Sequence, residues 1–422
     1  MTLPDTVAAV MAAADEIRSW QEDLYRDLHR HPELSHQEHR TAAAVAERLA
    51  MAGFEVTTGV GGTGVVGVLR NGEGPTVLLR ADMDALPVRE ETGLPYASTA
   101  TAIPIGADAE VPVMHACGHD MHTACLAGAA QLLAGGEKHW CGTLVTVFQP
   151  AEETIDGAQG MVDDGLAGLT GPVDVVLGQH VAPLPAGTLA TIPGPAFAGG
   201  ASIRITVYGR GGHASMPQST VDPVVLAAAI VLRLQGVVAR EIEPGEPAVL
   251  TVGSLHAGSK ANIIADRAEL LVNIRFYRES VRSTLLAAIR RIVTAECAAS
   301  GSPHDAEIEI FEEAPVTDND AEVTARVDDA FTAVLGADAM ITAPLVTGSE
   351  DFSDIARGVN APYTFWLFGG ADPALFGAAE AAGGMPTDLP VNHSPHFAPL
   401  IQPTLDTGTA ALVAAALAWL AG

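Results

Sequence analysis

The segment Thr76-Val-Leu-Leu-Arg-Ala-Asp-Met-Asp84 places two carboxylates directly after a short apolar run. Apolar runs of this length are typical of strands that are buried on both faces of a parallel sheet. Four other segments show the same pattern, at residues 64–69, 144–148, 173–177 and 363–367. Helical spacing, as at residues 41–51, alternates with them. The sequence therefore predicts an α/β fold with a mostly parallel central sheet.

Polar side chains follow several of these predicted strands. Asp82 and Asp84 come after the strand at 76–79, Glu152 and Glu153 after the next one, and His180 after the one that ends at residue 177. In open α/β sheets, ligands bind at the carboxyl ends of the strands. We therefore expect these side chains to lie at a common site.

The run His115-Ala-Cys117-Gly-His119-Asp120-Met-His122 combines a thiol, three imidazoles and a carboxylate. Together with the acidic pair Glu152 and Glu153, these groups suit borderline divalent metals. A different enzyme class would use Cys117 as a nucleophile with His119 or His122 as its base. Metal storage or sensing without catalysis is a third hypothesis, but it gives no reason for a base beside a ligand.

Composition excludes several classes of partner. The 422 residues carry a net charge of −29 at pH 7, which disfavours nucleic acid and anionic membranes because both would be repelled. Four cysteines in a chain of this length indicate a reducing cytoplasm. The N-terminus lacks the basic start and apolar core of a signal peptide, and the apolar stretch at 410–421 is too short to span a bilayer. We expect a cytoplasmic protein.

The pattern changes near Gly199, where a second domain is predicted. Strand patterns at 201–207, 248–255, 267–276 and 306–311 are interrupted by helical patterns at 222–239 and 280–300. The order βαββαβ is that of a self-contained split-βαβ unit. The sequence therefore predicts a discontinuous first domain, residues 1–197 and 313–422, with residues 198–312 inserted in it.

The chain resembles a known family in six motifs. They are Asp82-Met-Asp84-Ala-Leu-Pro87, His115 to His122, Gln149-Pro-Ala-Glu-Glu153, Gly211-Gly-His213-Ala-Ser215, Gly348-Ser-Glu-Asp-Phe352 and Asn392-His-Ser-Pro-His-Phe397. In this order they resemble the motifs of a dinuclear-metal amidohydrolase family that contains hippurate hydrolases, aminoacylases, auxin-conjugate hydrolases and, more distantly, metallo-carboxypeptidases. The resemblance covers most of the chain. It implies a zinc-peptidase-like catalytic domain and an inserted ferredoxin-like domain that serves as a lid or for dimerisation.

The resemblance also implies a metal site. Its ligands would be Cys117, His119, Glu153, His180 and His393, shared by two divalent ions such as manganese, zinc, cobalt or nickel. The distant carboxypeptidases have a histidine ligand where this chain has Asp82, and a bridging aspartate where it has Cys117, which points to the aminoacylase branch. His115, Asp120 and His122 are expected to orient ligands through hydrogen bonds, with direct coordination as the alternative.

Roles for the acidic residues follow from the same resemblance. Glu152 is the candidate general base, which takes a proton from water and delivers it to the leaving amine. The alternative is that Glu152 and Glu153 both coordinate metal. Asp84 matches the family's orienting aspartate, expected to hydrogen-bond a ligand imidazole, and Asp82 is assigned a structural role.

The inserted domain supplies three further candidates. His213 is implied to stabilise the oxyanion, often in the site of a partner subunit, so we expect a homodimer formed through this domain; a polar turn residue is the alternative. Asn262 and Arg275 match substrate-binding positions, and Arg275 suits a free carboxylate, although an outward charge on a strand would look the same. Glu350 and Asp351 are assigned no chemical step.

The function expected from these residues is hydrolysis of an N-acyl amino acid by metal-activated water. Hippurate-like, N-acetyl and indole-acetyl conjugates are all candidate substrates, because the sequence does not define the acyl group. A carboxypeptidase or dipeptidase acting on small peptides is the alternative.

Overall fold

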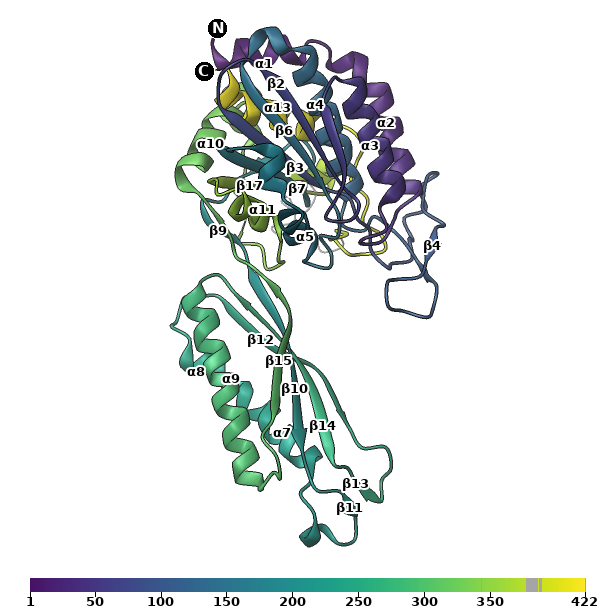
Figure 1. The fold of residues 1–422 in the computed structure, drawn as a ribbon, viewed down its shortest axis with the longest axis vertical. Helices are drawn as coiled ribbons and strands as arrows, with labels where there is room; N and C mark the ends of the chain where they lie inside the picture. The colour runs from purple at the N-terminus through teal and green to yellow at the C-terminus, as the bar shows by residue number, and fades with distance from the viewer. Residues whose placement is uncertain (343, 377–385, 387–388, 422) are drawn as a thin grey trace. The chain divides into compact units, whose positions relative to one another are not determined.

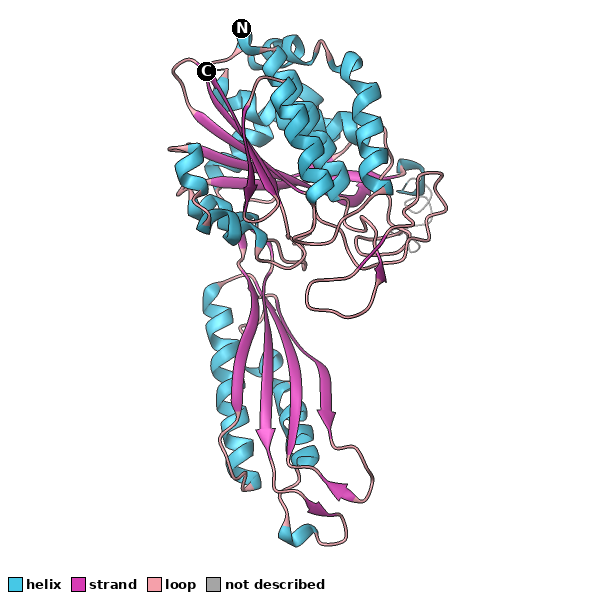
Figure 2. Cartoon of the chain, turned by 45° about the vertical axis from the view of Figure 1, so that its right-hand side comes forward, coloured by secondary structure: helices cyan, strands magenta, loops and turns pink. Residues whose placement is uncertain are grey.

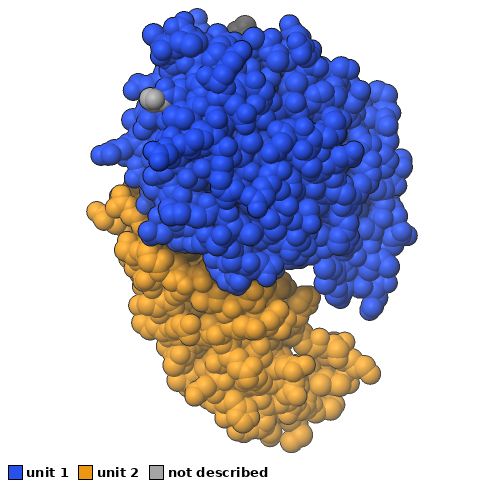
Figure 3. Space-filling model, turned by 45° about the horizontal axis from the view of Figure 1, so that its top comes forward, with its two compact units in different colours: residues 1–194, 318–344, 351–422 blue, residues 195–317, 345–350 orange. Residues whose placement is uncertain are grey.

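A computed structural model of the protein describes residues 1–342, 344–376, 386 and 389–421. The chain divides into two compact units, coloured separately in Figure 3. Unit 1 comprises Met1–Gly194, Asp318–Pro344 and Asp351–Gly422, and unit 2 comprises Pro195–Thr317 and Leu345–Glu350. The short segment Leu345–Glu350 thus packs with unit 2, although the sequence predicts that it belongs to the other domain.

Unit 1 is built on a seven-stranded sheet (Figure 1). Its strands, in spatial order, are β1 (Glu55–Val60), β2 (Gly64–Asn71), β6 (Gly142–Gln149), β3 (Thr76–Asp82), β7 (Val175–Pro185), β17 (Tyr363–Ala371) and β8 (Leu189–Ala190). The four strands β6, β3, β7 and β17 run parallel to one another. Nearly every residue of β3 and β6 is buried, as expected for central strands covered on both faces.

Helices cover both faces of this sheet. They are α1 (Leu3–Met11), α2 (Ala14–Arg30), α3 (His39–Met51), α4 (His119–Gly135), α5 (Gly157–Asp163), α6 (Leu166–Thr170), α10 (Ala321–Leu335), α11 (Phe352–Gly358) and α13 (Thr404–Leu420). Leu177 of β7 shares a core with residues of α4 and α13. The next residue, Gly178, faces Phe352 of α11. Because successive residues of a strand point to opposite faces, α11 covers the other side of the sheet.

Unit 2 contains a four-stranded antiparallel sheet with helices packed on it (Figure 2). Its elements are β10 (Gly199–Tyr208), α7 (Pro223–Leu234), α8 (Gly236–Glu241), β12 (Ala248–Ala257), β14 (Arg267–Phe276), α9 (Glu279–Ser300) and β15 (Glu307–Ala314). The spatial order is β12-β14-β10-β15. Burial alternates along β10 and β14, so one face of the sheet is in the core and the other is partly exposed.

The predicted elements are present in both units. Each predicted strand of the parallel sheet is observed, and the order of the four main strands and two long helices in unit 2 is the predicted βαββαβ. The stretch Pro223–Glu241 is apolar and long enough to cross a membrane by length and composition alone. Leu226, Ile230 and Leu234 of this stretch pack in the core of unit 2, as in a core helix.

Short elements complete the described part of the chain. They are β4 (Thr101–Ala102), β5 (Val111–Pro112), η1 (Glu137–His139), β9 (Gly194–Phe197), β11 (Gly212–His213), η2 (Pro217–Ser219), β13 (Ile263–Ile264), β16 (Thr317–Asn319) and η3 (Ala337–Ala339).

A buried ion cluster joins α2 to α4. His29 Nδ1 lies 2.7 Å from Asp120 Oδ2, and His29 Nε2 lies 3.1 Å from Glu90 Oε1. Burial by itself lowers the pKa of His29, but the hydrogen bonds to Asp120 and Glu90 outweigh it and raise the pKa to about 9. His29 is therefore a buried imidazolium at neutral pH, paired with two carboxylates.

This pairing predicts a loss of stability at alkaline pH. The pKa of His29 rises on folding from 6.5 to about 9, so its stabilisation is complete below pH 6.5 and is lost as the pH rises through 9. The full shift corresponds to about 3 kcal/mol of unfolding free energy. Urea unfolding with a chelator present, at pH 6.5 and 9, should show a loss of stability that is larger in the wild type than in His29→Gln by up to about 3 kcal/mol. Equal losses in both proteins would contradict it.

Candidate metal centre

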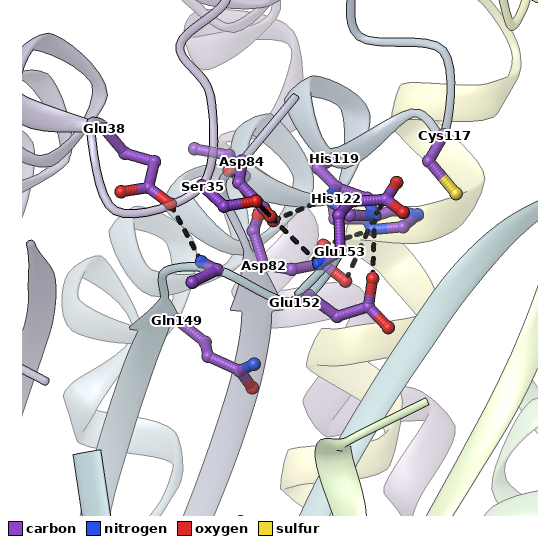
Figure 4. A network of polar contacts seen from close by, with 12 residues as sticks. Ser35, Glu38, Asp82, Asp84, Cys117, His119, His122, Gln149, Glu152 and Glu153 are labelled. Atoms are coloured by element: carbon purple, nitrogen blue, oxygen red, sulfur yellow. Dashed lines mark hydrogen bonds and ion pairs between the residues drawn. The ribbon is translucent and has the colours of Figure 1, made fainter. Parts of the chain in front are cut away.

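The candidate site lies at the carboxyl ends of the parallel strands of unit 1 (Figure 4). Asp82 is the last residue of β3, and Glu152 and Glu153 follow β6. His180 lies within β7, and His119 begins α4 directly after the loop that holds Cys117. The prediction that the polar residues after these strands meet at one end of the sheet is confirmed.

Asp84 fixes the orientation of the His119 ring. Asp84 Oδ1 lies 3.1 Å from His119 Nδ1. The other oxygen, Oδ2, accepts hydrogen bonds from Ser35 Oγ at 2.7 Å and from the backbone N–H of Glu153 at 3.0 Å. Because the carboxylate is held at both oxygens, it presents a fixed acceptor to Nδ1 and leaves His119 Nε2 for another partner.

The other four predicted ligands lie around the thiol of Cys117. Cys117, Glu153 and His393 form a group whose ligand atoms all lie within 4.8 Å of one another. His180 Nε2 is 3.5 Å from Cys117 Sγ, and His119 Nε2 is 3.9 Å from Glu153 Oε1. The thiol thus lies close both to the group formed with Glu153 and His393 and to the His180 imidazole.

Two buried atoms of this cluster fit a metal ion. His119 Nε2 and Glu153 Oε1 are inaccessible to solvent and have no hydrogen-bond partner among the described residues. Buried polar atoms are nearly always satisfied, so both call for an additional partner. An imidazole lone pair and a carboxylate oxygen beside a thiol form a donor set that suits a divalent cation.

The protonation states at this site follow from burial and charge. Burial raises the pKa of Glu153 to about 8, and it raises that of the Cys117 thiol well above its ordinary value. For His119, burial lowers the pKa, but Asp82 and Asp84 outweigh it and hold the pKa well above the ordinary value. All three groups bind metal in their deprotonated forms, so metal binding would release protons.

Glu152 lies next to these groups without belonging to the cluster around the thiol. Its side chain is buried, and Oε2 is 3.8 Å from His119 Nε2. The preceding residue, Ala151, has a φ of +52°, which an L residue rarely adopts. Glu38 Oε1 accepts the backbone N–H of Ala151 at 2.8 Å and so stabilises this bend.

Ser35 and Glu38 are site residues that sequence reasoning missed. Both lie in the loop between α2 and α3, outside the predicted strands and motifs. Their partners, Asp84 and the backbone of Ala151, are distant in the sequence. A serine and a glutamate in a loop without a motif show no sequence pattern that would mark them as site residues.

The other polar residues of the run 115–122 have different neighbours. Asp120 pairs with His29, which is not a candidate ligand. His122 hydrogen-bonds Asp82 and the backbone N–H of Val181. His115 is buried, and neither ring nitrogen has a hydrogen-bond partner among the residues that the structure describes. Burial lowers the pKa of His115 to about 4, so its ring is neutral.

Arg80 hydrogen-bonds residues from three segments next to the site: the end of β3, the end of β6 and the residue before α11. Its guanidinium donates to Asp82 at 2.7 Å, to Gln149 at 2.8 Å and to Asp351 at 3.2 Å. Gln149 also donates to Asp351, at 2.7 Å. Asp351, which the sequence left without a role, therefore holds the buried arginine from the start of α11.

The candidates in unit 2 lie in two separate places. His213 in β11 pairs with Ile263 in β13, and the N–H of Ala214 donates to the carbonyl of Asn262 at 3.1 Å. His213 and Asn262 are therefore brought together at the end of the sheet where β14 begins (Figure 1). Arg275 is the penultimate residue of β14. The strand between them spans about 26 Å.

Comparison with known proteins agrees with this geometry. Residues 78–382 match the model of peptidase family M20/M25/M40. A thermostable carboxypeptidase from Saccharolobus solfataricus is 38% identical over 86% of this chain and 89% of its own length. An IAA-amino acid hydrolase from Arabidopsis thaliana is 34% identical (86% and 79%), and an N-acetylcysteine deacetylase from Bacillus subtilis is 36% identical (78% and 83%).

Solved structures agree over the whole length. A putative aminohydrolase from methicillin-resistant Staphylococcus aureus superposes with a TM-score of 0.84 at 30% identity, covering 97% of this chain and 98% of that one. A Bacillus subtilis protein described as a dinuclear metal binding peptidase has a TM-score of 0.76 at 28% identity, covering 96% and 99%. With motifs, fold and sequence in agreement, the chain belongs to peptidase family M20/M25/M40.

Proposed function

We propose that this protein hydrolyses the amide bond of N-acyl amino acids with two divalent metal ions. The metal ligands in this proposal are Cys117, His119, Glu153, His180 and His393. The observation that carries it is the buried carboxylate of Glu152, whose Oε2 lies 3.8 Å from the unpartnered Nε2 of His119. A base beside a metal-binding cluster is what hydrolysis by activated water requires.

Each residue has a distinct task in this proposal. Bound divalent ions would polarise the scissile carbonyl and acidify water. Glu152 takes the proton from the attacking water and donates it to the nitrogen of the leaving amine. Asp84 keeps the Nε2 atom of His119 directed at the site through its hydrogen bond to Nδ1. Burial of these groups strengthens every charge interaction among them, since little solvent screens them.

Arg275 is the proposed receptor for the free carboxylate of the substrate. Its Nε donates to Asn273 Oδ1 at 3.0 Å, and its Nη1 donates to Ser349 Oγ. Among the described residues it has no carboxylate within ion-pair distance, although the chain has 51 acidic side chains. A half-buried guanidinium that is held by neutral groups and lacks a counterion is suited to an anionic ligand.

The names of two relatives support N-acyl amino acids as the substrate class, and the name of a third supports peptides as the alternative. One relative is named for IAA-amino acids and another for N-acetylcysteine, and both names describe an acyl group on an amino acid. A third is named a carboxypeptidase. Small peptides also offer an amide next to a free carboxylate, so peptide hydrolysis is the second candidate. Indole-acetyl, N-acetyl and hippurate-like conjugates are the proposed substrates.

The thiol-hydrolase hypothesis is disfavoured by the environment of Cys117. Burial raises the pKa of this thiol, and the neighbouring carboxylate of Glu153 raises it further. A nucleophilic cysteine needs the opposite, an electropositive site that stabilises the thiolate. Metal storage is disfavoured as well, because it assigns no purpose to Glu152 or Arg275.

Glu152→Gln should abolish turnover and keep the metal. Loss of the base is expected to lower kcat by about 10²- to 10⁴-fold, because general acid–base catalysis contributes that much. Glu153→Gln is the matched control, since the same change one residue later should instead reduce the bound metal measured by elemental analysis. Near-normal turnover in Glu152→Gln would exclude Glu152 as the base.

A substrate screen tests the role of Arg275. N-acetyl, N-benzoyl and indole-acetyl amino acids should be cleaved faster than dipeptides, and Arg275→Gln should raise KM by about 10- to 100-fold, since a hydrogen-bonded charge pair is lost. The carboxamide analogue of the best substrate is the control, because its KM should be unchanged by the substitution. An equal KM change for both compounds would contradict carboxylate recognition.

We further propose a homodimer formed through unit 2. Asn262 and His213 lie at one end of β14 and Arg275 near the other, so one small substrate cannot contact both groups within a single chain. A partner subunit that supplies His213 and Asn262 would resolve this. Strand β12 is at the edge of the sheet, and the neighbouring α7 exposes Val225 (65%) and Leu232 (76%). An open edge beside apolar side chains suits a subunit interface.

Mixing two inactive variants tests this arrangement. His213→Ala and Glu152→Gln should each be inactive alone, but unfolding and refolding a 1:1 mixture should restore roughly a quarter of wild-type activity. Half of the randomly formed dimers would be hybrids, each with one intact site. A mixture as inactive as its components, although sedimentation shows a dimer, would place His213 outside the partner's site.

The proposed location is the cytoplasm. All four cysteines are free thiols, and Cys117 would bind metal as a thiolate, which a reducing compartment preserves. Recovery of the protein from a periplasmic or extracellular fraction would contradict this.

A further inference from the structure

Two buried residues beside the candidate ligands, Asp82 and His122, take no part in the proposed function as stated so far. Their polar atoms lie within 4.8 Å of those of His119 and His180, so on proximity alone all four could bind a metal ion. His122 is in the first turn of α4 and is 1% exposed. Its hydrogen bonds decide between coordination and another function.

Both ring nitrogens of His122 are already engaged. The backbone N–H of Val181 donates to His122 Nε2 at 2.7 Å. An amide N–H can only donate, so Nε2 must be the unprotonated acceptor. Nδ1 then carries the ring proton and donates it to Asp82 Oδ1 at 2.6 Å. His122 is thus a neutral imidazole with no lone pair left for a metal ion.

The bond from Val181 replaces a missing sheet contact. Strands β3 and β7 are paired only as far as Arg80 and Gly178. The two strands are not paired beyond this point, and the N–H of Val181 donates to His122 rather than to β3. Val181 remains paired with Phe368 of β17, and the imidazole of His122 satisfies its N–H, so this part of β7 is also bonded to α4.

Val181 in turn orients His180. The carbonyl of Val181 accepts the hydrogen bond from His180 Nδ1 at 2.8 Å. This bond places the ring proton of His180 on Nδ1, so Nε2, which is 3.5 Å from Cys117 Sγ, carries the lone pair. Val181 is therefore held by His122 at its N–H, and its carbonyl sets the tautomer of His180.

Asp82 fixes the position of His122, whose Nδ1 donates to it. Its Oδ2 accepts from Arg80 Nη1 at 2.7 Å, while its Oδ1 accepts from His122. Its backbone carbonyl accepts from Thr123 Oγ1 at 2.9 Å, which ties it to α4 again. Each side-chain oxygen of Asp82 thus already accepts a hydrogen bond, one from the guanidinium and one from the imidazole.

We propose that His122 and Asp82 are positioning residues that hold His180 in its metal-binding tautomer and are not themselves ligands. The proposal rests on the proposed function, because it assumes that His180 binds metal. It predicts that the acceptor at Nε2 of His122 matters for metal affinity even though no metal touches it.

Two amide variants of His122 that differ in side-chain length test the positioning role. In His122→Gln the side-chain oxygen can replace Nε2 and accept the N–H of Val181, whereas in His122→Asn the shorter side chain cannot reach it. Titration of the metal-free proteins with Co²⁺ against a competing chelator should give two ions with affinities within about threefold of wild type for the glutamine variant. The asparagine variant should bind one of the two ions about 10- to 100-fold more weakly, as is usual when a ligand loses its orienting partner.

His180→Ala is the control for outright loss of a ligand. If His122→Gln loses an ion as completely as His180→Ala does, His122 is a ligand and the inference is wrong. Wild-type affinity in His122→Asn would also overturn it. A wild-type protein that binds no metal would instead refute the proposed function, so the two failures are distinguishable.

A second measurement uses the wild-type protein, so it does not depend on whether a variant folds. Long-range ¹H–¹⁵N spectra of the metal-free wild-type protein should show His122 as a neutral ring protonated at Nδ1. A ring protonated at Nε2, or at both nitrogens, would exclude the hydrogen bond from Val181 and with it the proposed positioning role.

Discussion

One buried guanidinium, that of Arg80, ties together the ends of β3 and β6 beside the candidate metal centre. It lies at the centre of the parallel sheet, 1% exposed, and contacts Asp82 on its own strand, Gln149 at the end of β6 and Asp351 before α11. A charge at this depth is stable only if it is paired and fully hydrogen-bonded. The polar ends of β3 and β6 are therefore fixed relative to each other by the need to satisfy Arg80.

The same neighbourhood carries more buried negative charge than positive charge. Asp82, Asp84 and Asp351 are all buried, and Arg80 is the one arginine among the largest fully buried side chains of the described chain. Desolvation makes such an excess costly unless cations enter. In the protein without metal, the His119 ring supplies such a positive charge, because the carboxylates hold its pKa well above its ordinary value. The site is thus arranged for cations, and protons compete with metal for it.

The sequence was sufficient for the strands, because burial leaves a different pattern in each unit. Strands covered on both faces, such as β3, read as continuous apolar runs, and half-exposed strands, such as β14, read as alternation. The meeting of Asp82, Glu152, Glu153 and His180 at one end of the sheet was also predictable, since these residues follow the apolar runs of the predicted strands, whereas the roles of Cys117, His119 and His393 rest on the family resemblance. Ser35 and Glu38 were not, because their roles depend on how the loop between α2 and α3 packs against β3 and the turn after β6. The separation of Asn262 from Arg275, by contrast, follows from the predicted strand at 267–276, which β14 matches.

The discontinuity of unit 1 determines when its sheet can be completed during translation. Strand β17, which pairs with β7, and helix α13, which packs against β3 and β7, both follow unit 2 in the chain. Unit 2 needs nothing beyond residue 350. The nascent chain must therefore carry an unfinished, apolar sheet edge while its inserted neighbour already has all of its own residues. The sheet of unit 1 can therefore be completed only after all residues of unit 2 have been synthesised.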